Sequence, residues 1–411
     1  MKINKIAVSL IAAGVMASPL AQATNGYFSH GYGMKAKGMA GVGIALPQDS
    51  LAAATNPAGI VMVGNRIDVG VDLFKPNRNT ELTSLMGPAA GTYSGNGDSS
   101  FVIPEFGYNK MLGTDSAVGV AVYGNGGMNT KYTDFNTRTG GAMFGTGDLG
   151  VDLSQLFIAP TYARKLNPDN SIGISLNLAY QRFKAEGLQN FAMFSATPGS
   201  LSNNGYDSST GWGVRIGWTG QITPAVSLGA TYQTKTKMGK FSKYAGLFAE
   251  QGGFDIPANY GVGVAFKLDN STTLAADVQT IQYSGVKSIA NSGNVLQPLG
   301  SNGGPGFGWK DMTVLKFGAS HKYDSNLEVR AGFSTGKQPI PDNETQFNVL
   351  APGIVENHLT LGGTWTLANN GEVTVGYMHA FKKTVTGTGA TAGFNLNMSE
   401  DSLGVAYGWK M

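Results

Sequence analysis

The sequence predicts an all-β membrane protein: a 14-stranded antiparallel outer-membrane β-barrel with a small N-terminal plug, or hatch, inside its lumen. Composition is the first observation behind this prediction, because only 13% of the residues are charged, whereas soluble domains contain about 25%. The chain is rich in Gly (60), Phe (20) and Tyr (16), and no window reaches the roughly 18 apolar residues of a spanning helix. Alternating polarity and alternating connection lengths, described below, are the other two observations.

The first 23 residues have the three parts of a secretory signal peptide. Lys2 and Lys5 form the charged start, residues 6–17 form an apolar stretch too short to span a membrane, and Ala21-Gln22-Ala23 forms a small-residue cleavage site. We therefore expect residues 1–23 to be removed and the mature chain to begin at Thr24, in preference to an N-terminal anchor helix.

Residues 24–64 are expected to form the plug. They are rich in Gly and Ala, are interrupted by Pro47 and Pro57, and are too few to bury a core of their own. Such a segment is stable only inside a larger structure, and we assign that enclosure to a barrel formed by residues 65–411. Eight strands can fill their lumen with side chains but 16 to 18 leave a channel, so a barrel of 14 strands needs a filling segment.

From residue 65 onward, apolar and polar residues alternate, and this period of two predicts β-strands. Each segment has at least the 9 to 11 residues, approximately, with which a tilted strand crosses a bilayer. One face of the last segment is expected to meet lipid: Leu403, Val405, Tyr407, Trp409 and Met411. The predicted strands are 66–75, 100–110, 116–125, 154–166, 171–184, 210–221, 225–237, 258–268, 272–283, 312–323, 326–337, 355–367, 372–381 and 401–411.

The connections between these segments alternate between short and long. The short ones are 111–115, 167–170, 222–224, 269–271, 324–325 and 368–371. The long ones are 76–99, 126–153, 185–209, 238–257, 284–311, 338–354 and 382–400. An up-and-down barrel with both chain ends on the periplasmic side of the outer membrane requires this order, whereas a secreted soluble adhesin does not.

The start of the mature chain resembles the FadL-type family of outer-membrane transporters of hydrophobic substrates. The residues that carry the resemblance are GYGMKAKGMAGVGIA at 31–45 and NPAG at 56–59. The layout of signal, short plug and 14 strands extends the resemblance over the whole mature chain, although Met411 stands where such barrels usually end on an aromatic residue. The family includes transporters of long-chain fatty acids and uptake channels for aromatic hydrocarbons.

The resemblance implies a route for passive transport. Substrate is caught in an apolar groove formed by the third and fourth extracellular loops, and then passes to a tighter lumen pocket beside the start of the plug. It leaves sideways into the outer membrane through an opening made by a kink in the third strand. The resemblance does not decide between long-chain fatty acids, which we favour, and monoaromatic hydrocarbons.

Apolar residues in two predicted extracellular loops are the candidates for the outer groove. The third loop contributes Phe191, Met193 and Phe194. In the fourth loop the spacing i, i+3, i+6 and i+7 predicts one apolar face of a short helix, formed by Phe241, Tyr244, Leu247 and Phe248. Exposed apolar patches of this kind often bind ligands, although these side chains could also pack on each other as the core of the loops.

The lumen pocket would need a cation if the ligand is a fatty acid, because a carboxylate binds to cations or to backbone N–H groups. Strand parity places Arg215, Lys316 and Arg330 inward, and of these we favour Lys316. Tyr27 and Phe28 lie at the start of the plug, where the resemblance implies the pocket. Alternatively, the basic residues pair with the inward acids Asp68, Asp72, Glu105, Asp277 and Glu328.

The plug and the third strand contain further candidate positions. Asn56, Pro57 and Ala58 are expected to form a sharp turn at the pocket, because Asn before Pro favours a turn. Lys35 and Lys37 are expected to bind acids of the barrel wall. The kink in the third strand is placed where glycine is concentrated, and the alternative is a plain start of the following loop. The kink residues are Gly124, Asn125, Gly126 and Gly127.

Several function classes are disfavoured by the sequence. The net charge of +3 is spread along the chain, which disfavours nucleic acid, and the absence of Cys excludes disulfides and thiol chemistry. No phosphate-binding Gly-Lys-Ser/Thr loop is present, so no energy source is assigned. No Ser/His/acid motif includes any of the four histidines, and we expect no enzyme activity, catalytic residue, cofactor or metal. These histidines are His30, His321, His358 and His379.

The expected partners are a hydrophobic small molecule, the lipid of the outer membrane and lipopolysaccharide. Arg182 and Lys184 fall near the outer end of a strand, where they would touch lipopolysaccharide. The protein is expected to be a monomer in the outer membrane of a Gram-negative bacterium. The alternative from a different class is a structural or adhesive barrel whose loops bind a host or a phage.

Overall fold

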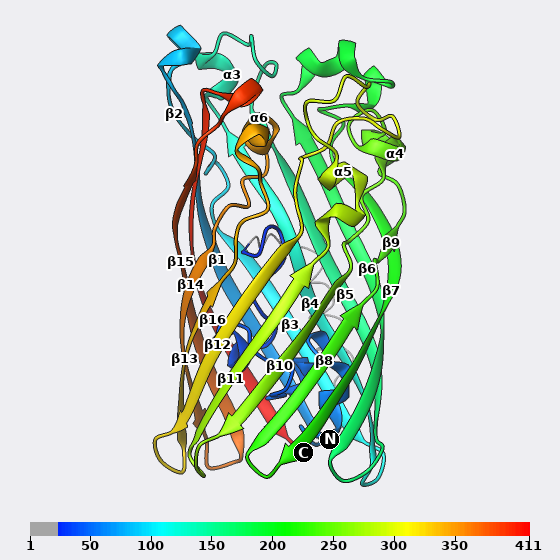
Figure 1. The fold of residues 1–411 in the computed structure, drawn as a ribbon, viewed down its shortest axis with the longest axis vertical. Helices are drawn as coiled ribbons and strands as arrows, with labels where there is room; N and C mark the ends of the chain where they lie inside the picture. Colours follow the sequence, from blue (N-terminus) through cyan, green and yellow to red (C-terminus); the bar gives the residue numbers. More distant parts are fainter. Residues whose placement is uncertain (1–23) are drawn as a thin grey trace.

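The computed structural model describes residues 24–411, and the predicted signal peptide lies outside the described residues. The described chain forms a single antiparallel sheet that closes on itself, because its last strand pairs with its first from Arg66↔Lys410 to Leu82↔Phe394 (Figure 1). The sheet has 16 strands, of which two short ones, β2 and β9, lie off the closed circuit, so that 16 minus 2 leaves 14. The prediction of a 14-stranded antiparallel barrel is confirmed.

The strands occur in the predicted order along the chain. The strands are β1 (Arg66–Leu82), β2 (Gly91–Ser94), β3 (Phe101–Met111), β4 (Ser116–Tyr132), β5 (Leu149–Lys165), β6 (Asn170–Glu186), β7 (Asp207–Thr223), β8 (Val226–Gln233), β9 (Lys237–Met238), β10 (Asn259–Lys267), β11 (Thr272–Ile281), β12 (Met312–Lys322), β13 (Leu327–Thr335), β14 (Asn357–Thr366), β15 (Gly371–Val385) and β16 (Phe394–Lys410).

Helices are short and lie in the N-terminal segment and in the long connections. They are α2 (Met34–Lys37), η1 (Ser50–Ala54), η2 (Pro57–Val61), η3 (Ser84–Ala89), α3 (Phe135–Arg138), η4 (Gln189–Phe194), η5 (Pro198–Ser200), η6 (Ser242–Tyr244), α4 (Ala249–Gly252), η7 (Tyr283–Gly285), α5 (Lys287–Ala290), η8 (Asp342–Glu344), α6 (Thr345–Asn348) and η9 (Gly389–Thr391). Within residues 24–411, no helix has the length and apolar character needed to cross a membrane.

Several strands continue beyond their predicted ends. β1 runs to Leu82 instead of residue 75, β4 runs to Tyr132 instead of residue 125, and β16 begins at Phe394 instead of residue 401. These extensions lie at the end of the barrel that carries the long connections (Figure 1). Beyond the apolar belt the outward positions no longer need to be apolar, so the alternation disappears although the backbone pairing continues.

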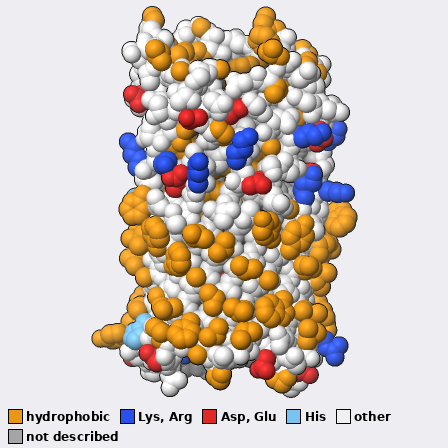
Figure 2. Space-filling model, viewed as in Figure 1, with side chains coloured by type: hydrophobic (Ala, Val, Ile, Leu, Met, Phe, Trp, Pro, Cys, Tyr) orange, Lys and Arg blue, Asp and Glu red, His pale blue; other side chains and the backbone are white. Residues whose placement is uncertain are grey.

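The outer surface carries an apolar belt. On β6, for example, Ile172, Ile174, Leu176 and Leu178 are all exposed, each with 40% to 48% of its surface accessible. Figure 2 shows this belt on one face, with Lys and Arg side chains gathered above it towards the long connections. The predicted outward face is confirmed for Leu403, Val405 and Trp409 of β16, all of which are exposed, and Met411, just beyond its end, is exposed as well.

The N-terminal segment, residues 24–64, lies inside the barrel and is almost entirely buried (Figure 1). Its turn at Asn56 is an N-cap, because the side-chain oxygen of Asn56 accepts a hydrogen bond from the N–H of Ala58 at 3.1 Å. The wall has glycine where this turn meets it: a Cβ atom on Gly173 would lie 2.4 Å from the carbonyl carbon of Pro57, and one on Gly217 would lie 1.9 Å from Oδ1 of Asn56.

Two buried lysines tie the same segment to the barrel wall. Lys35 Nζ lies 2.6 Å from Oε2 of Glu372, and Lys37 Nζ lies 2.9 Å from Asp72 and 3.4 Å from Glu105. The predicted contacts of both lysines with wall acids are confirmed. Because buried charges are tolerated only when paired, these contacts hold the segment in one position in the lumen.

Candidate functional site

A chain of buried aromatic rings begins under the extracellular connections. Phe183, on the wall strand β6, has Tyr244 at 4.8 Å and Phe248 at 4.6 Å between ring centroids. Phe248 lies 4.8 Å from Phe254, which in turn lies 6.2 Å from Tyr27 of the N-terminal segment. This aromatic column therefore joins the fourth long connection to the start of the N-terminal segment through side chains alone.

The fourth-loop candidates are part of this column and not of an exposed face. Phe241, Tyr244, Leu247 and Phe248 are all buried, and the three aromatic residues among them pack around Phe183, as in the alternative of a loop core. The expectation of one short helix is wrong, because residues 241–248 contain only the single turn η6, followed by turn residues. The next helix, α4, begins at Ala249, and its residues Glu250 and Gln251 have φ values of 59° and 57°, which a continuous right-handed helix does not allow.

Tyr27 and Phe28 stand at the lower end of the column. Ring centroids of Tyr27 lie 5.5 Å from Tyr283 and 6.0 Å from Trp309, and Phe28 meets Tyr283 edge-on at 6.0 Å. The hydroxyl of Tyr283 accepts a hydrogen bond from the N–H of Tyr27 at 3.2 Å and donates to the carbonyl of Asn25. Burial raises the pKa of Tyr283 well above its ordinary value, so this hydroxyl stays neutral and keeps both bonds.

The third-loop candidates divide between the interior and the surface. Phe191 packs against Phe144 and Phe347, at 5.6 Å and 5.2 Å between centroids. Met193 and Phe194 are 81% and 61% exposed. The chain beside them is bonded to the fifth long connection, since the N–H of Leu299 donates to the carbonyl of Phe194 at 2.9 Å. The exposed apolar residues of this loop therefore adjoin the fifth connection as well as the fourth.

A small polar cavity lies beside the N-terminal segment, with a volume of about 20 Å³. Arg215 and Lys316 line it together with Asp277, Tyr32 and Thr231. A cavity of this size holds roughly one water molecule, so a larger molecule could occupy it only if the surrounding residues moved. Among the described residues that line this cavity, two of the three predicted inward cations thus meet a single carboxylate, that of Asp277.

The bonds of these cations leave donors free. Arg215 donates to the carbonyl of Thr55 at 3.0 Å and to Oε1 of Gln233 at 2.5 Å, and its buried Nε has no partner among the described residues. Lys316 donates to the carbonyl of His30 at 2.9 Å. Asp277 accepts from the N–H groups of the N-terminal segment at positions 43 and 44, at 2.8 Å and 3.1 Å.

Arg330 is placed elsewhere. Its guanidinium forms an ion pair with Glu328 at 2.9 Å and donates to Thr364 at 2.7 Å, and it does not line the small cavity. For this residue the alternative of pairing with an inward-facing acid is correct.

The wall beside the cavity contains an irregularity in β4 at the residues predicted to kink. The pairing of β4 with β5 shifts register between Gly124 and Gly126, with Asn125 as the extra residue of a β-bulge. The alternative of a plain loop start is wrong, because β4 continues to Tyr132. A Cβ atom on Gly126 would lie 1.9 Å from the carbonyl oxygen of Tyr27, so the N-terminal segment packs directly on the bulge.

Tyr32, which sequence reasoning did not select, connects the cavity to this bulge. It lines the cavity, its ring lies 4.5 Å from that of Tyr123 on β4, and its hydroxyl lies 3.3 Å from Oδ1 of Asn125. Tyr32 sits within the GYGMK run, but neither its spacing nor its residue type distinguishes it from its neighbours. Its position between cavity and wall follows only from the folding of the segment.

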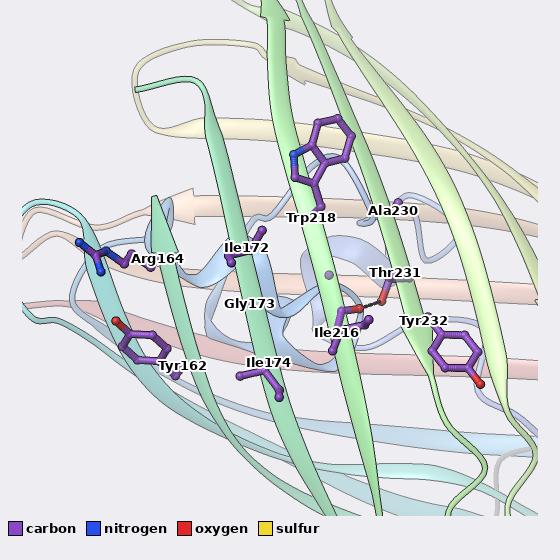
Figure 3. A pocket seen from close by; sticks show the side chains of 11 residues that line it. Tyr162, Arg164, Ile172, Gly173, Ile174, Ile216, Trp218, Ala230, Thr231 and Tyr232 are labelled. Atoms are coloured by element: carbon purple, nitrogen blue, oxygen red, sulfur yellow. Dashed lines mark hydrogen bonds between the residues drawn. The ribbon is translucent and has the colours of Figure 1, made fainter. Parts of the chain in front are cut away.

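The larger hollows adjoining the site lie on the lipid-facing surface. Figure 3 shows one of about 640 Å³, with Ile172 and Ile174 of β6, Ile216 and Trp218 of β7, and Tyr232 of β8 around it. Ile172, Ile174, Ile216 and Tyr232 are exposed residues of the apolar belt, so the hollow is part of the outer surface of the barrel. Its floor is Gly173 and Gly217, whose inner sides receive the turn at Asn56. Among residues 24–411 no group of three or more His, Cys, Asp or Glu could hold a metal ion.

A closed 14-stranded barrel with an apolar outer belt has the architecture of an outer-membrane β-barrel, and its filled lumen distinguishes it from open porins. Residues 13–410 match the family described as outer membrane protein transport protein (OMPP1/FadL/TodX), and the chain belongs to this family. Members of the family are transport channels of the Gram-negative outer membrane and not enzymes.

The chain is also similar to curated relatives and, in its fold, to solved structures. The chain is 24% identical over 388 residues to the long-chain fatty acid transport protein of Escherichia coli K12, covering 82% of this chain and 83% of that protein. It superposes on the toluene transporter TodX of Pseudomonas putida with a TM-score of 0.70 at 19% identity, covering 93% of this chain and 99% of that one. A Pseudomonas aeruginosa FadL homologue superposes with a TM-score of 0.69 at 14% identity, covering 96% and 100%.

Proposed function

We propose that this channel carries long-chain fatty acids passively across the outer membrane, with the N-terminal segment acting as its plug. The observation that carries the proposal is the small cavity beside that segment, where the buried cations Arg215 and Lys316 face only one carboxylate, Asp277. The unpartnered Nε of Arg215 is a donor that a ligand carboxylate can use. An uncharged aromatic solute has no carboxylate that could pair with these cations. The name of the curated Escherichia coli relative supports the same substrate class.

The aromatic column supplies the driving force for entry. Burial of an acyl chain yields roughly 0.8 kcal/mol per CH₂, so ten buried methylenes give on the order of 8 kcal/mol before the cost of ordering the chain. The column is closely packed in this conformation, and a ligand therefore enters by displacing loop side chains or residues 24–32, which we call the arm. Met193 and Phe194 are the exposed apolar residues that a ligand meets first.

The exit is proposed at the β4 bulge. Tyr32 stands between the cavity and Asn125, so movement of the arm would open a path from the cavity to the wall. Release into lipid takes the acyl chain from one apolar setting to another, and the energy gained on entry is kept without an external energy source.

The same proposal places the charged side chains above the apolar belt against lipopolysaccharide. Arg182 and Lys184 follow the exposed aliphatic residues on the outward face of β6, and both lie over the ring of Tyr206, at 4.7 Å and 5.5 Å. We propose a monomer, since one chain closes its own barrel through the pairing of β16 with β1.

The substrate class is tested by changing one buried cation. Purified Lys316→Met should bind oleate roughly 10- to 100-fold more weakly than the parent, the loss expected for a charge-assisted hydrogen bond, while toluene binding stays unchanged. Lys237→Met, at an exposed position of β9, is the matched control and should bind both compounds normally. Equal loss of both ligands would refute the role of Lys316. Parent protein that binds and transports toluene but not oleate would favour the alternative, uptake of monoaromatic hydrocarbons. TodX, whose fold is similar, is a toluene transporter.

A further inference from the structure

Strands β3 and β4 separate at a defined point of the barrel wall. They pair from Met111↔Ala117 up to Phe106↔Val122 and no further. Beyond that point β3 still pairs with β1 as far as Phe74↔Phe101, and β4 still pairs with β5 as far as Tyr132↔Leu149. Among the described strands, the upper halves of β3 and β4 therefore each pair with one long strand of the barrel. The backbone of residues 95–97 also bonds to β4, at Lys131.

The hydrogen-bond pattern identifies the residue at which the ladder stops. The N–H of Leu112 donates to the carbonyl of Ser116 at 2.8 Å, which makes these two a hydrogen-bonded pair. Such pairs alternate along an antiparallel ladder, so on β3 the residues at 110, 108, 106 and 104 direct their backbone groups towards β4. The next pair after Phe106↔Val122 would join Pro104 to Gly124, and proline has no N–H to donate.

The free edge of β4 is occupied by partners other than β3. The N–H of Ser29 donates to the carbonyl of Asn125 at 3.1 Å, and the N–H of Gly127 donates to the carbonyl of Tyr27 at 3.0 Å. Further along, Arg78 donates to the carbonyl of Asn129. Three residues of the arm thus act as a short antiparallel strand in the place that β3 leaves.

Another proline of the wall shows what a missing N–H does by itself. The N–H of Leu166 donates to the carbonyl of Asn170, so the residues of β5 at 164, 162 and 160 face β6. The pairing of β5 with β6 is interrupted at Pro160, between Ile158↔Leu178 and Thr161↔Ser175, and then resumes. A proline alone interrupts a ladder without parting two strands. At Pro104 the ladder does not resume, because the bulge and the arm meet β4 at the same point.

We propose that Pro104 is a positioning residue for lateral exit: by ending the β3–β4 ladder opposite the bulge, it leaves the edge of β4 to the arm. When the arm withdraws, the edge of β4 at residues 125–127 is then free for solute to pass, and β3 cannot close it. The role in solute exit rests on the proposed function. The separation of β3 and β4 does not depend on that function. The buried side chains of Ile103 on β3 and Tyr123 on β4 lie on either side of the point where the two strands separate.

The test restores the missing donor. Pro104→Ala places an N–H opposite Gly124 with little change in volume, and Pro160→Ala is the matched control at an equivalent position in a paired wall. A second variant combines Pro104→Ala with deletion of Asn125, which removes the bulge and restores one continuous register. Hydrogen exchange of residues 101–107 is measured in detergent micelles, oleate binding is measured on the same samples, and oleate uptake is measured in cells.

In Pro104→Ala we expect exchange of residues 101–107 and oleate uptake both to slow by about two- to tenfold, the range given by one restored backbone hydrogen bond. The double variant should slow both further. Oleate binding should stay at the parent level in both variants, and Pro160→Ala should match the parent in uptake and binding. A loss of binding parallel to the loss of uptake would indicate a merely structural defect and overturn the assignment.

Unchanged exchange in both Pro104 variants, or equal slowing of uptake in Pro160→Ala, would also overturn it. Failure of the proposed function would look different: the parent would carry no oleate, and the exchange measurement would still decide whether Pro104 parts the two strands.

Discussion

The buried cation of Lys37 provides a direct test of how the N-terminal segment is held. Its Nζ lies between Asp72 and Glu105, and the side chains of the three residues are 6%, 0% and 5% exposed. In Lys37→Met both carboxylates lose the ion pair with Lys37 while remaining buried. Removal of one partner from a buried ion pair costs about 3 to 5 kcal/mol.

This cost acts only while the segment is seated. When the segment leaves the lumen, water fills it and hydrates Asp72 and Glu105, so the penalty falls on the closed form alone. At 1.36 kcal/mol per factor of ten, the population of the released form should rise roughly 100- to 5,000-fold. The measurement is ion conductance of single barrels in planar bilayers, supported by cell sensitivity to a large hydrophilic antibiotic.

Two further variants separate charge from packing. Lys37→Arg keeps the cation and should conduct like the parent. In a variant that combines Lys37→Met with Asp72→Asn and Glu105→Gln, the site is neutral, and closure should be largely restored because neutralised buried groups no longer repel. Parent-like conductance of Lys37→Met, or conductance in the neutral variant as high as in Lys37→Met, would refute the reasoning.

Three other predictions concern the path. Gly126→Ala should displace the arm from β4, because its Cβ would lie 1.9 Å from the carbonyl oxygen of Tyr27; faster hydrogen exchange of residues 27–29 would confirm it, and unchanged exchange would contradict it. Pro57→Ala, at the turn seated against Gly173 and Gly217, should reduce oleate uptake while oleate binding persists. Removal of residues 24–32 should also reduce oleate uptake, and wild-type uptake by either variant would count against the coupling. Tyr32→Ala should remove the ring between cavity and bulge and raise the rate of oleate release from preloaded protein in bilayers, whereas an unchanged rate would exclude Tyr32 as a barrier.

Much of the fold could be read from the sequence because the membrane imposes simple local demands. Each crossing strand must be apolar on one face and cover a fixed thickness, so alternation and segment length recur in every strand. The contacts of Lys35 and Lys37 were predictable for a related reason, since a charge in a filled lumen requires an opposite charge. The extensions of β1 and β4 were missed because alternation stops where lipid stops.

The loop aromatics were harder to place. Phe241 and Phe248 have the same spacing whether the face that they form meets water or another loop, and only the packing on Phe183 decides between these environments. The same holds for Arg330, whose inward orientation follows from parity but whose pairing with Glu328 depends on side-chain geometry.

By itself, the sequence determined the barrel, its strand number, the order of short and long connections and a segment that must be enclosed. Periodicity records the surroundings of each residue, and lipid, lumen and water leave different patterns. The tertiary structure decided which distant residues share one place: Tyr27 with Gly126, Arg215 with Lys316, and Pro104 opposite the bulge of β4. These contacts between distant residues depend on strand register and on the path of the arm, and a local sequence pattern carries no information about either.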